Sequence, residues 1–261
     1  MLAFHLIEDN ANHVQFESVI GCDVVHQFPL HVHHSLCIGL ITKGMRRILF
    51  SGHEVCVQEN EMFVINPLQP HTIQQSDPHD YAVIIVRGLA DCPVFHQHIK
   101  SIHCKRLFVN LLDSIQSGDI KEVSAHWKKL FVYLCRYWRR QPFTTTTHAI
   151  IEKSMAYITK NYQNSITVSD IAKNSCMSTF HYCRLFKSLM GISPHKCLIQ
   201  YRLSMSYKAL QANHSVFDSA IDSGFYDSSH FVRNFYDQMS ISPQSYRQSI
   251  LKNSKNIQQD T

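Results

Sequence analysis

One helix-turn-helix pattern occurs twice in this chain, at residues 166–194 and 216–247, and this repeat constrains the fold more than any other feature. Each copy reads as a short apolar helix around an alanine (Ala172 or Ala220), a tight turn, and a second helix that ends before a Ser-Pro pair. A helix-turn-helix places the start of its second helix in the DNA major groove, braced by the first helix. The repeat therefore predicts an all-α part of the chain that binds DNA through two reading helices.

Both copies also match a known family pattern. The matches are Asp-Ile-Ala at 170–172, Met-Ser at 177–178, Arg-Leu-Phe-Lys at 184–187, Gly-Ile-Ser-Pro at 191–194, Arg202, Gly-Phe at 224–225, Phe231, Arg233, Phe235, Ser-Pro at 242–243 and Tyr-Arg at 246–247. Together they resemble the DNA-binding domain of the AraC family of bacterial transcription regulators. The resemblance implies two helix-turn-helix units joined by one long helix, at residues 194–212, that fixes their spacing.

The distribution of charge agrees with a DNA-binding C-terminal part. Residues 1–147 carry 13 Lys+Arg and 13 Asp+Glu, whereas residues 148–261 carry 12 and 7, so the net charge of +5 lies wholly in the second part. A basic domain beside a neutral one is typical of a module that contacts phosphates. A solvated basic surface would show the same excess, and the helix-turn-helix repeat decides between the two.

Other sequence signals bound the location of the protein. No stretch approaches the 18 consecutive apolar residues of a membrane-spanning helix, and the start MLAFHLIEDN lacks the pattern of a secretory signal. The nine cysteines show no C-x-x-C pair, which favours reduced thiols over a disulfide framework. We expect a cytoplasmic protein with no membrane partner.

The N-terminal part has β character between residues 28 and 86. Its short apolar runs, separated by turn signals, are 36–42, 48–50, 55–57, 62–65 and 81–86. Such runs predict a sandwich or small barrel. With the His31-x-His33 pair, Pro70-His71 and the run 60–67, this part resembles the cupin-type sensor domain of the same family. The fold class expected is α+β in two domains: a cupin-like β-barrel with two helices at its C-terminal end, then the all-α domain.

Two amphipathic helices are expected after the strands, at residues 94–117 and 119–140, interrupted at Ser117-Gly118-Asp119. The second carries an apolar stripe of Trp127, Leu130, Leu134 and Trp138. Such a stripe either packs on its own domain or remains free for a second chain. In AraC-like regulators this helix pair often forms the dimer interface, so we expect a homodimer through these four residues.

The expected segments follow in chain order. They are a cupin-like effector-sensing domain at 1–93, a helical dimerisation segment at 94–141, a linker at 142–148, the DNA-binding domain at 149–252 and a polar tail at 253–261.

In the first unit, Ser178 is expected to cap the recognition helix. The candidate DNA contacts at its start are Ser178, Thr179, Phe180, His181, Cys183, Arg184 and Lys187. Arg184 is the candidate base reader, because its planar fork can bind O6 and N7 of guanine together. Lys187 is expected to contact phosphate.

In the second unit the candidate contacts are Ser228, Ser229, Val232 and Arg233. Ser219, Tyr236 and Ser240 depart from the family pattern, and Ser240 replaces a glycine that normally adopts positive φ, a conformation other residues tolerate poorly. We expect this unit to contribute less sequence specificity than the first.

For the sensor domain, His31, His33, Arg46 and His71 are the candidate residues for binding a small polar effector. A three-histidine metal site remains an alternative. The glutamate of metal-binding cupins is replaced by Cys37 or Ile38, so no metal or other cofactor is expected.

The sequence predicts a transcription regulator, in the activating mode common among such relatives, that binds double-stranded DNA and RNA polymerase and responds to a small molecule. No catalytic residue is expected, so the chain is not expected to be an enzyme. Two alternatives remain: a metal-dependent cupin oxygenase tethered to DNA, and a redox regulator reacting through Cys22, Cys37 or Cys56. No basic cluster flanks these thiols to activate them.

Overall fold

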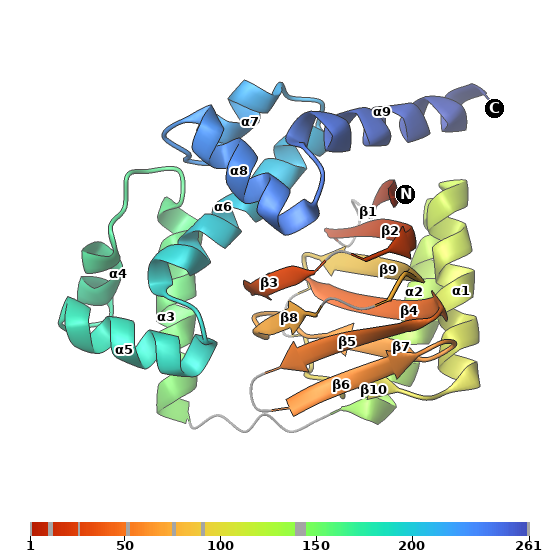
Figure 1. Cartoon of the computed structure of the whole chain (residues 1–261), viewed down its shortest axis with the longest axis horizontal. Coiled ribbons are helices and arrows are strands. Elements are labelled where there is room, and N and C mark those ends of the chain that lie inside the picture. Colours follow the sequence, from red (N-terminus) through yellow and green to blue (C-terminus); the bar gives the residue numbers. More distant parts are fainter. Residues whose placement is uncertain are drawn as a thin grey trace. The chain divides into compact units, whose positions relative to one another are not determined.

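The computed structural model describes residues 2–9, 13–25, 27–50, 53–74, 77–89, 92–138 and 145–259, with the backbone alone for residues 145–148 and 252–259. The chain divides into two units. The first comprises residues 1–27, 34–141 and 249–261, and the second comprises residues 28–33 and 142–248. Strands dominate the first unit and helices the second (Figure 1).

The larger sheet of the first unit is antiparallel throughout. In spatial order its strands are β1 (Leu2–Asp9), β2 (Val14–Val24), β9 (His79–Arg87), β4 (Leu36–Lys43), β7 (Met62–Ile65) and β10 (His98–Ile99). The expected strands at 36–42, 62–65 and 81–86 are confirmed within β4, β7 and β9. Strands β1 and β2 were not anticipated from the sequence.

A second sheet contains β8 (His71–Ile73), β5 (Met45–Phe50) and β6 (His53–Gln58) in that order. The described strands form two sheets and do not close into one barrel, an arrangement that is compatible with the β-rich, cupin-like domain expected from the sequence. Alternation of apolar residues predicts strands, but it does not specify which edges pair. The short strand β3 (Phe28–His31) groups with the second unit.

Helices α1 (Ile102–Ser117) and α2 (Ile120–Leu134) cover one face of the larger sheet (Figure 1). Their buried side chains share a core with alternate strand residues such as Leu36, Ile38 and Leu40. The chain turns between the helices at Gly118, which has φ 77°, and at Asp119, whose carboxylate caps α2. This break lies where the sequence predicts it.

Both helices are shorter than expected. Helix α1 begins at Ile102, because β10 pairs with β7 and Phe95 forms a β-bridge with Trp138. Helix α2 ends at Leu134 and continues as a 3-10 turn, η1 (Cys135–Tyr137). Trp138 therefore lies outside the helix whose apolar stripe it was expected to extend.

The helical unit contains α3 (Thr145–Asn161), α4 (Val168–Asn174), α5 (Thr179–Met190), α6 (Pro194–Gln211), α7 (Val216–Asp222), α8 (Ser228–Met239) and the start of α9 (Pro243–Gln259). Helix α6 joins the two helix-turn-helix pairs, α4–α5 and α7–α8 (Figure 1). In the expected linker, residues 142–144 lie outside the described residues and 145–148 begin α3. In the expected polar tail, α9 continues to Gln259, and residues 260–261 lie outside the described residues.

Candidate nucleic-acid interface

The first recognition helix, α5, starts at a capped turn. The Ser178 hydroxyl accepts a hydrogen bond from the His181 amide at 3.4 Å. The preceding helix α4 starts with a capping box, in which Thr167 and Asp170 bond each other's backbone amides. Capping of this kind satisfies the free N–H groups of a first turn. The caps therefore fix the point where α5 begins to present side chains.

The two faces of α5 differ sharply. Tyr182 and Phe186 are fully buried, and the Tyr182 hydroxyl donates to the Ser154 hydroxyl of α3 at 2.9 Å. The outer face exposes Ser178, Thr179, Phe180, His181, Arg184 and Lys187, with Cys183 partly buried. Phe180 is 72% exposed, and the Arg184 guanidinium lies 5.6 Å from its ring. An exposed aromatic ring beside an arginine can pack against bases while the arginine binds base edges.

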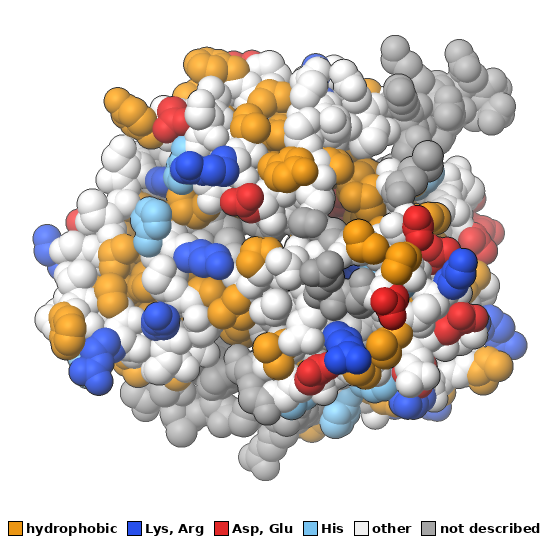
Figure 2. Space-filling model, in the orientation of Figure 1, with side chains coloured by type: hydrophobic (Ala, Val, Ile, Leu, Met, Phe, Trp, Pro, Cys, Tyr) orange, Lys and Arg blue, Asp and Glu red, His pale blue; other side chains and the backbone are white. Residues whose placement is uncertain are grey.

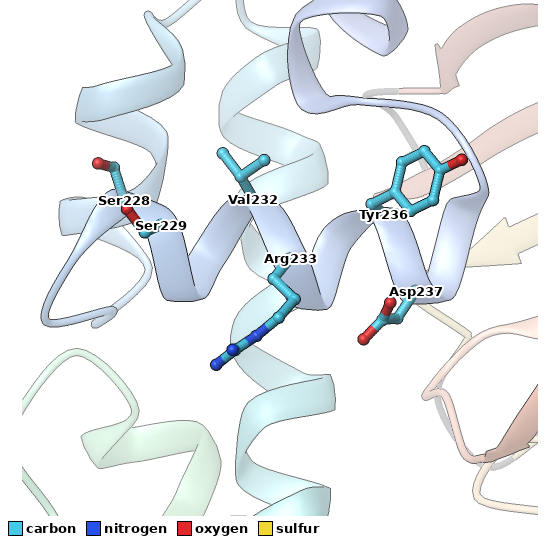
Figure 3. Close-up of a pocket in the computed structure, with 6 residues that line it drawn as sticks. All are labelled: Ser228, Ser229, Val232, Arg233, Tyr236 and Asp237. Atoms are coloured by element: carbon cyan, nitrogen blue, oxygen red, sulfur yellow. The ribbon is translucent and has the colours of Figure 1, made fainter.

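The second recognition helix, α8, is built in the same way. The Asp227 carboxylate caps it by accepting from the His230 amide at 2.7 Å, while Phe231 and Phe235 are fully buried. The outer face forms a shallow open hollow lined by Ser228, Ser229, Val232, Arg233, Tyr236 and Asp237. In this hollow the Val232 and Tyr236 side chains point to one side of the helix and Arg233 to the other (Figure 3).

The two recognition helices end in the same backbone conformation. Gly191 ends α5 with φ 68° and Ser240 ends α8 with φ 59°. The departure that the sequence singled out is therefore a serine held in the left-handed region, with its hydroxyl buried and without a hydrogen-bond partner. The second unit keeps the turn although it lacks the residue best suited to it.

Two arginines brace equivalent places in the two units. Arg202 of α6 donates from Nε to the Tyr162 carbonyl and from Nη2 to the Asn164 carbonyl, both at 2.8 Å. Arg247 of α9 donates from Nη2 to the Oδ1 of Asn213 at 2.6 Å. Arg202 thus ties α6 to the turn that follows α3, and Arg247 ties α9 to the turn that follows α6. These hydrogen bonds give Arg202 and Arg247, two of the four arginines in the family pattern, a role that requires no contact with DNA.

The net charge differs between the two helix-turn-helix units. Residues 148–211 hold eight Lys+Arg against two Asp+Glu, a net of +6, whereas residues 212–248 hold two against four, a net of −2. On the face in view in Figure 2 the Lys and Arg side chains stand apart and do not form one continuous patch. Residues 148–211, which include the first helix-turn-helix unit, therefore provide most of the electrostatic attraction to a DNA phosphate backbone.

The candidate effector residues are divided between the strand-rich first unit and the helical second unit of the chain. His31 and His33, in the second unit, have ring centroids 5.9 Å apart. The Nδ1 of His31 lies 2.8 Å from the Pro29 carbonyl, and burial lowers the pKa of His31 to about 4. His71, in the first unit, is 1% exposed, and its Nδ1 lies 2.9 Å from the Gln69 carbonyl.

Arg46 has neighbours that the sequence did not suggest. Its Nε donates to Nε2 of His79 at 2.9 Å, and its guanidinium carbon lies 3.7 Å from the centroid of the Tyr81 ring. Burial lowers the pKa of Arg46, and burial together with the charge of Arg46 lowers the pKa of His79. His79 and Tyr81 lie two residues apart on β9, a spacing that places them on one face of a strand, but strand spacing alone does not point to Arg46.

The candidate dimer residues occupy different environments. Trp127, Leu130 and Leu134 are buried in the core that α1 and α2 share with the larger sheet, whereas Trp138 is 59% exposed. The outer side of α2 exposes Val132. The apolar stripe of α2 thus packs on its own unit, which is the first of the two outcomes that amphipathicity allows.

The cysteines are all free thiols. Burial raises the pKa of Cys37 to about 12, which makes its thiol unreactive near neutral pH. Cys22 and Cys56 are exposed.

Comparison with known families matches both halves of the chain. A model described as an AraC-like ligand binding domain matches residues 13–130, and one described as a helix-turn-helix domain matches residues 171–249. The lactose operon transcription activator of Staphylococcus xylosus is 31% identical over 241 residues, which cover 83% of this chain and 85% of that protein. The chain belongs to the AraC family.

Other relatives agree with this assignment. The HTH-type transcriptional regulator YbfI of Bacillus subtilis (strain 168) is 23% identical over 84% of this chain and 86% of its own length. The crystal structure of ToxT from Vibrio cholerae O395 matches 96% of this chain and 97% of its own with a TM-score of 0.60 at 11% identity, which shows a common fold. This AraC-family protein is a DNA-binding transcription regulator with a ligand-binding domain. No described helix is long and apolar enough to cross a membrane.

Proposed function

We propose that this AraC-family protein activates transcription in the cytoplasm by reading DNA mainly through α5. The observation that carries the proposal is the outer face of α5, where Arg184, Lys187 and the exposed Phe180 ring project from a helix whose other face is fully packed. The net charge of +6 over residues 148–211 supports the same conclusion. The α8 face, with Ser228, Ser229, Val232 and Arg233, supplies the second, weaker set of contacts.

The proposal assigns different roles to the two cations of α5. Arg184 lies one turn from the N-terminus of α5, where side chains reach base edges, and its fork suits guanine. Lys187 lies nearly one turn further on and supplies a point charge for phosphate. Arg184→Ala should lower affinity for the specific site by about 1–3 kcal/mol and relax preference at one or two positions. Lys187→Ala should weaken binding to specific and random DNA alike.

Gel shifts of the full-length protein on its own promoter and on random DNA, over a range of salt concentrations, test these roles. Wild-type affinity should fall steeply with salt, and Lys187→Ala should reduce that slope by about one. Lys128→Ala removes an exposed cation from α2 and serves as the matched control. Equal losses of Arg184→Ala on both DNAs would make Arg184 a positioning contact, and absence of binding by the wild type at low salt would end the proposal.

The partners proposed are RNA polymerase, a small-molecule effector and a second copy of the chain. Activation is supported by the relative from Staphylococcus xylosus, which is named a transcription activator. In vitro transcription from the bound promoter should rise when the protein is added. A homodimer through residues 119–140 would place two pairs of reading helices on two half-sites and raise the effective concentration of each. Because Leu130 and Leu134 are buried, the contact would use the outer side of α2.

A further inference from the structure

Arg46 is a buried cation with unused hydrogen-bonding capacity. It projects from β5 and is 3% exposed. Its Nε is bonded to His79, but its Nη2 is buried and has no hydrogen-bond partner. Among the described residues, the ion pairs of the first unit do not include Arg46. The Tyr81 side chain also forms a hydrogen bond with the guanidinium, but no described carboxylate pairs with it, so the position holds an un-neutralised charge and an Nη2 group that lacks an acceptor.

The histidine that accepts from the Nε of Arg46 does not balance the charge of the guanidinium. The Nδ1 of His79 lies 3.1 Å from the Asp77 carbonyl, so this nitrogen is the donor and Nε2 is free to accept from Arg46. That tautomer is neutral, and both burial and Arg46 itself lower the pKa of His79. His79 thus orients the guanidinium and leaves its charge in place.

A second arginine in the same unit shows the usual arrangement. Arg87 of β9 lies 2.7 Å from the carboxylate of Glu17, which is 1% exposed. A buried charge is costly unless a partner of opposite charge accompanies it. Glu17 is that partner for Arg87, whereas no carboxylate among the described residues pairs with Arg46. A buried guanidinium without a carboxylate partner therefore indicates a site where a ligand would supply the negative charge and the hydrogen-bond acceptors.

Two aromatic rings lie next to the Arg46 guanidinium. Its guanidinium carbon lies 3.7 Å from the Tyr81 centroid and 5.8 Å from the Phe63 centroid. The Phe63 ring lies over Gly39 on the adjacent strand, where an added Cβ would come within 2.1 Å of it, and the Tyr81 ring lies over Gly21 in the same way at 2.5 Å. Both glycines are needed because the rings occupy the space that their side chains would fill.

The rings and the guanidinium share the inner face of the larger sheet. The residues that flank Phe63 and Tyr81 in β7 and β9, Met62 and Ala82, belong to the core under α1 and α2. Because successive side chains of a strand alternate between faces, Phe63 and Tyr81 point away from the helices. Arg46, which comes from the other sheet, meets them there. This places the cation inside the strand-rich part of the unit, against aromatic faces.

We propose that Arg46 binds the carboxylate of a small organic acid, with the Phe63 and Tyr81 rings against its carbon body. The planar fork of a guanidinium matches a carboxylate, and a monocarboxylate balances the single charge of Arg46 one to one. A phosphate dianion would bring a second charge that the described neighbours do not balance. This inference rests on the proposed function in one respect: the acid is the effector of the regulator.

The test compares thermal unfolding of the full-length protein in acetate and benzoate with unfolding in acetamide and benzamide at equal ionic strength. The variants are Arg46→Met and, as the matched control, Arg47→Met. Arg47 is the next residue of β5, with its side chain 49% exposed and 3.9 Å from Glu54. Wild type and Arg47→Met should be stabilised by the acids and not by the amides, by roughly 5–10 °C near a hundred times the Kd. Arg46→Met should lose the response, with affinity lowered about 10- to 100-fold.

The same melts separate a ligand site from a structural arginine. Without any acid, Arg46→Met should be at least as stable as the wild type, because it removes an unpaired buried charge. A less stable Arg46→Met together with a wild type that ignores both acids would overturn the proposal, as would an acid response that survives in Arg46→Met. A response to inorganic phosphate but not to the carboxylates would also refute it. If Arg46→Met does not fold, Arg46→Lys, which keeps the charge and loses the fork, should bind the acids more weakly than the wild type, and equal binding would count against the proposal.

A gel shift with and without benzoate separates this site from its regulatory role. Acid binding with unchanged DNA affinity would keep the site and remove its role as effector site. Absence of DNA binding in any condition would contradict the proposed function and leave the melting result intact.

Discussion

The end of α8 allows a sharp test of how backbone strain is distributed between the two helix-turn-helix units. Ser240 adopts φ 59° where the equivalent residue of the first unit is Gly191 at φ 68°. An L-residue in the left-handed region costs about 1–2 kcal/mol. The buried, unpartnered Ser240 hydroxyl adds about 1 kcal/mol. Glycine loses about 0.5–1 kcal/mol more conformational entropy on folding. Ser240→Gly should therefore raise the free energy of unfolding by about 1–2 kcal/mol.

Scanning calorimetry on the full-length protein should show this gain as a rise in Tm of roughly 2–8 °C. Ser240→Ala separates the two contributions, because it removes the hydroxyl and keeps the Cβ, and it should recover only the smaller part. Gly191→Ser should lower the free energy of unfolding by about 1–2 kcal/mol. DNA affinity should not change in any of the three, since both positions lie at the end of the recognition helix opposite its DNA-facing start. An unchanged or lower Tm for Ser240→Gly would refute the strain argument.

Three further results are expected. Gly224→Ala should cost about 2–4 kcal/mol in urea unfolding, because Gly224 has φ 83° and an added Cβ would lie 2.3 Å from the Tyr162 carbonyl; wild-type stability would contradict the geometry. Burial lowers the pKa of His31 to about 4 in the native state, whereas the unfolded state binds a proton below about pH 6.5. The free energy of unfolding should therefore fall by roughly 3 kcal/mol as the pH is lowered from about 6.5 to about 4. His31→Gln should flatten that dependence, and an unaltered slope would rule His31 out as its source. Light scattering should show a dimer that Val132→Glu weakens without loss of fold, whereas Leu134→Glu, at a fully buried position, should lower the Tm; a wild-type mass near 30.2 kDa at micromolar concentration would contradict the dimer.

The helical unit could be read from the sequence because its signals are local. Ser178 caps α5 as expected, α5 ends before the Ser-Pro pair at 193–194, and α6 begins at Pro194, the first residue of the long helix expected at 194–212. Capping and turn chemistry act between residues that are neighbours in the chain. The burial of Tyr182 and Phe186 against the exposure of Arg184 and Lys187 likewise follows from helical spacing alone.

The strand-rich unit was decided by contacts between distant segments. Alternation located β4, β7 and β9, yet it could not show that β2 lies beside β9 or that the strands divide into two sheets, because pairing joins residues far apart in the chain. Amphipathicity marked Trp127, Leu130 and Leu134 as one stripe, and only the packed structure showed that the sheet covers it. In the same way the sequence offered Arg46 as one of four candidate effector-binding residues, without its neighbours. Only the packing of β5 against β7 and β9 shows that Arg46 is a buried cation beside the Phe63 and Tyr81 rings. Burial depends on segments far apart in the chain, so the sequence does not reveal that this charge is removed from water.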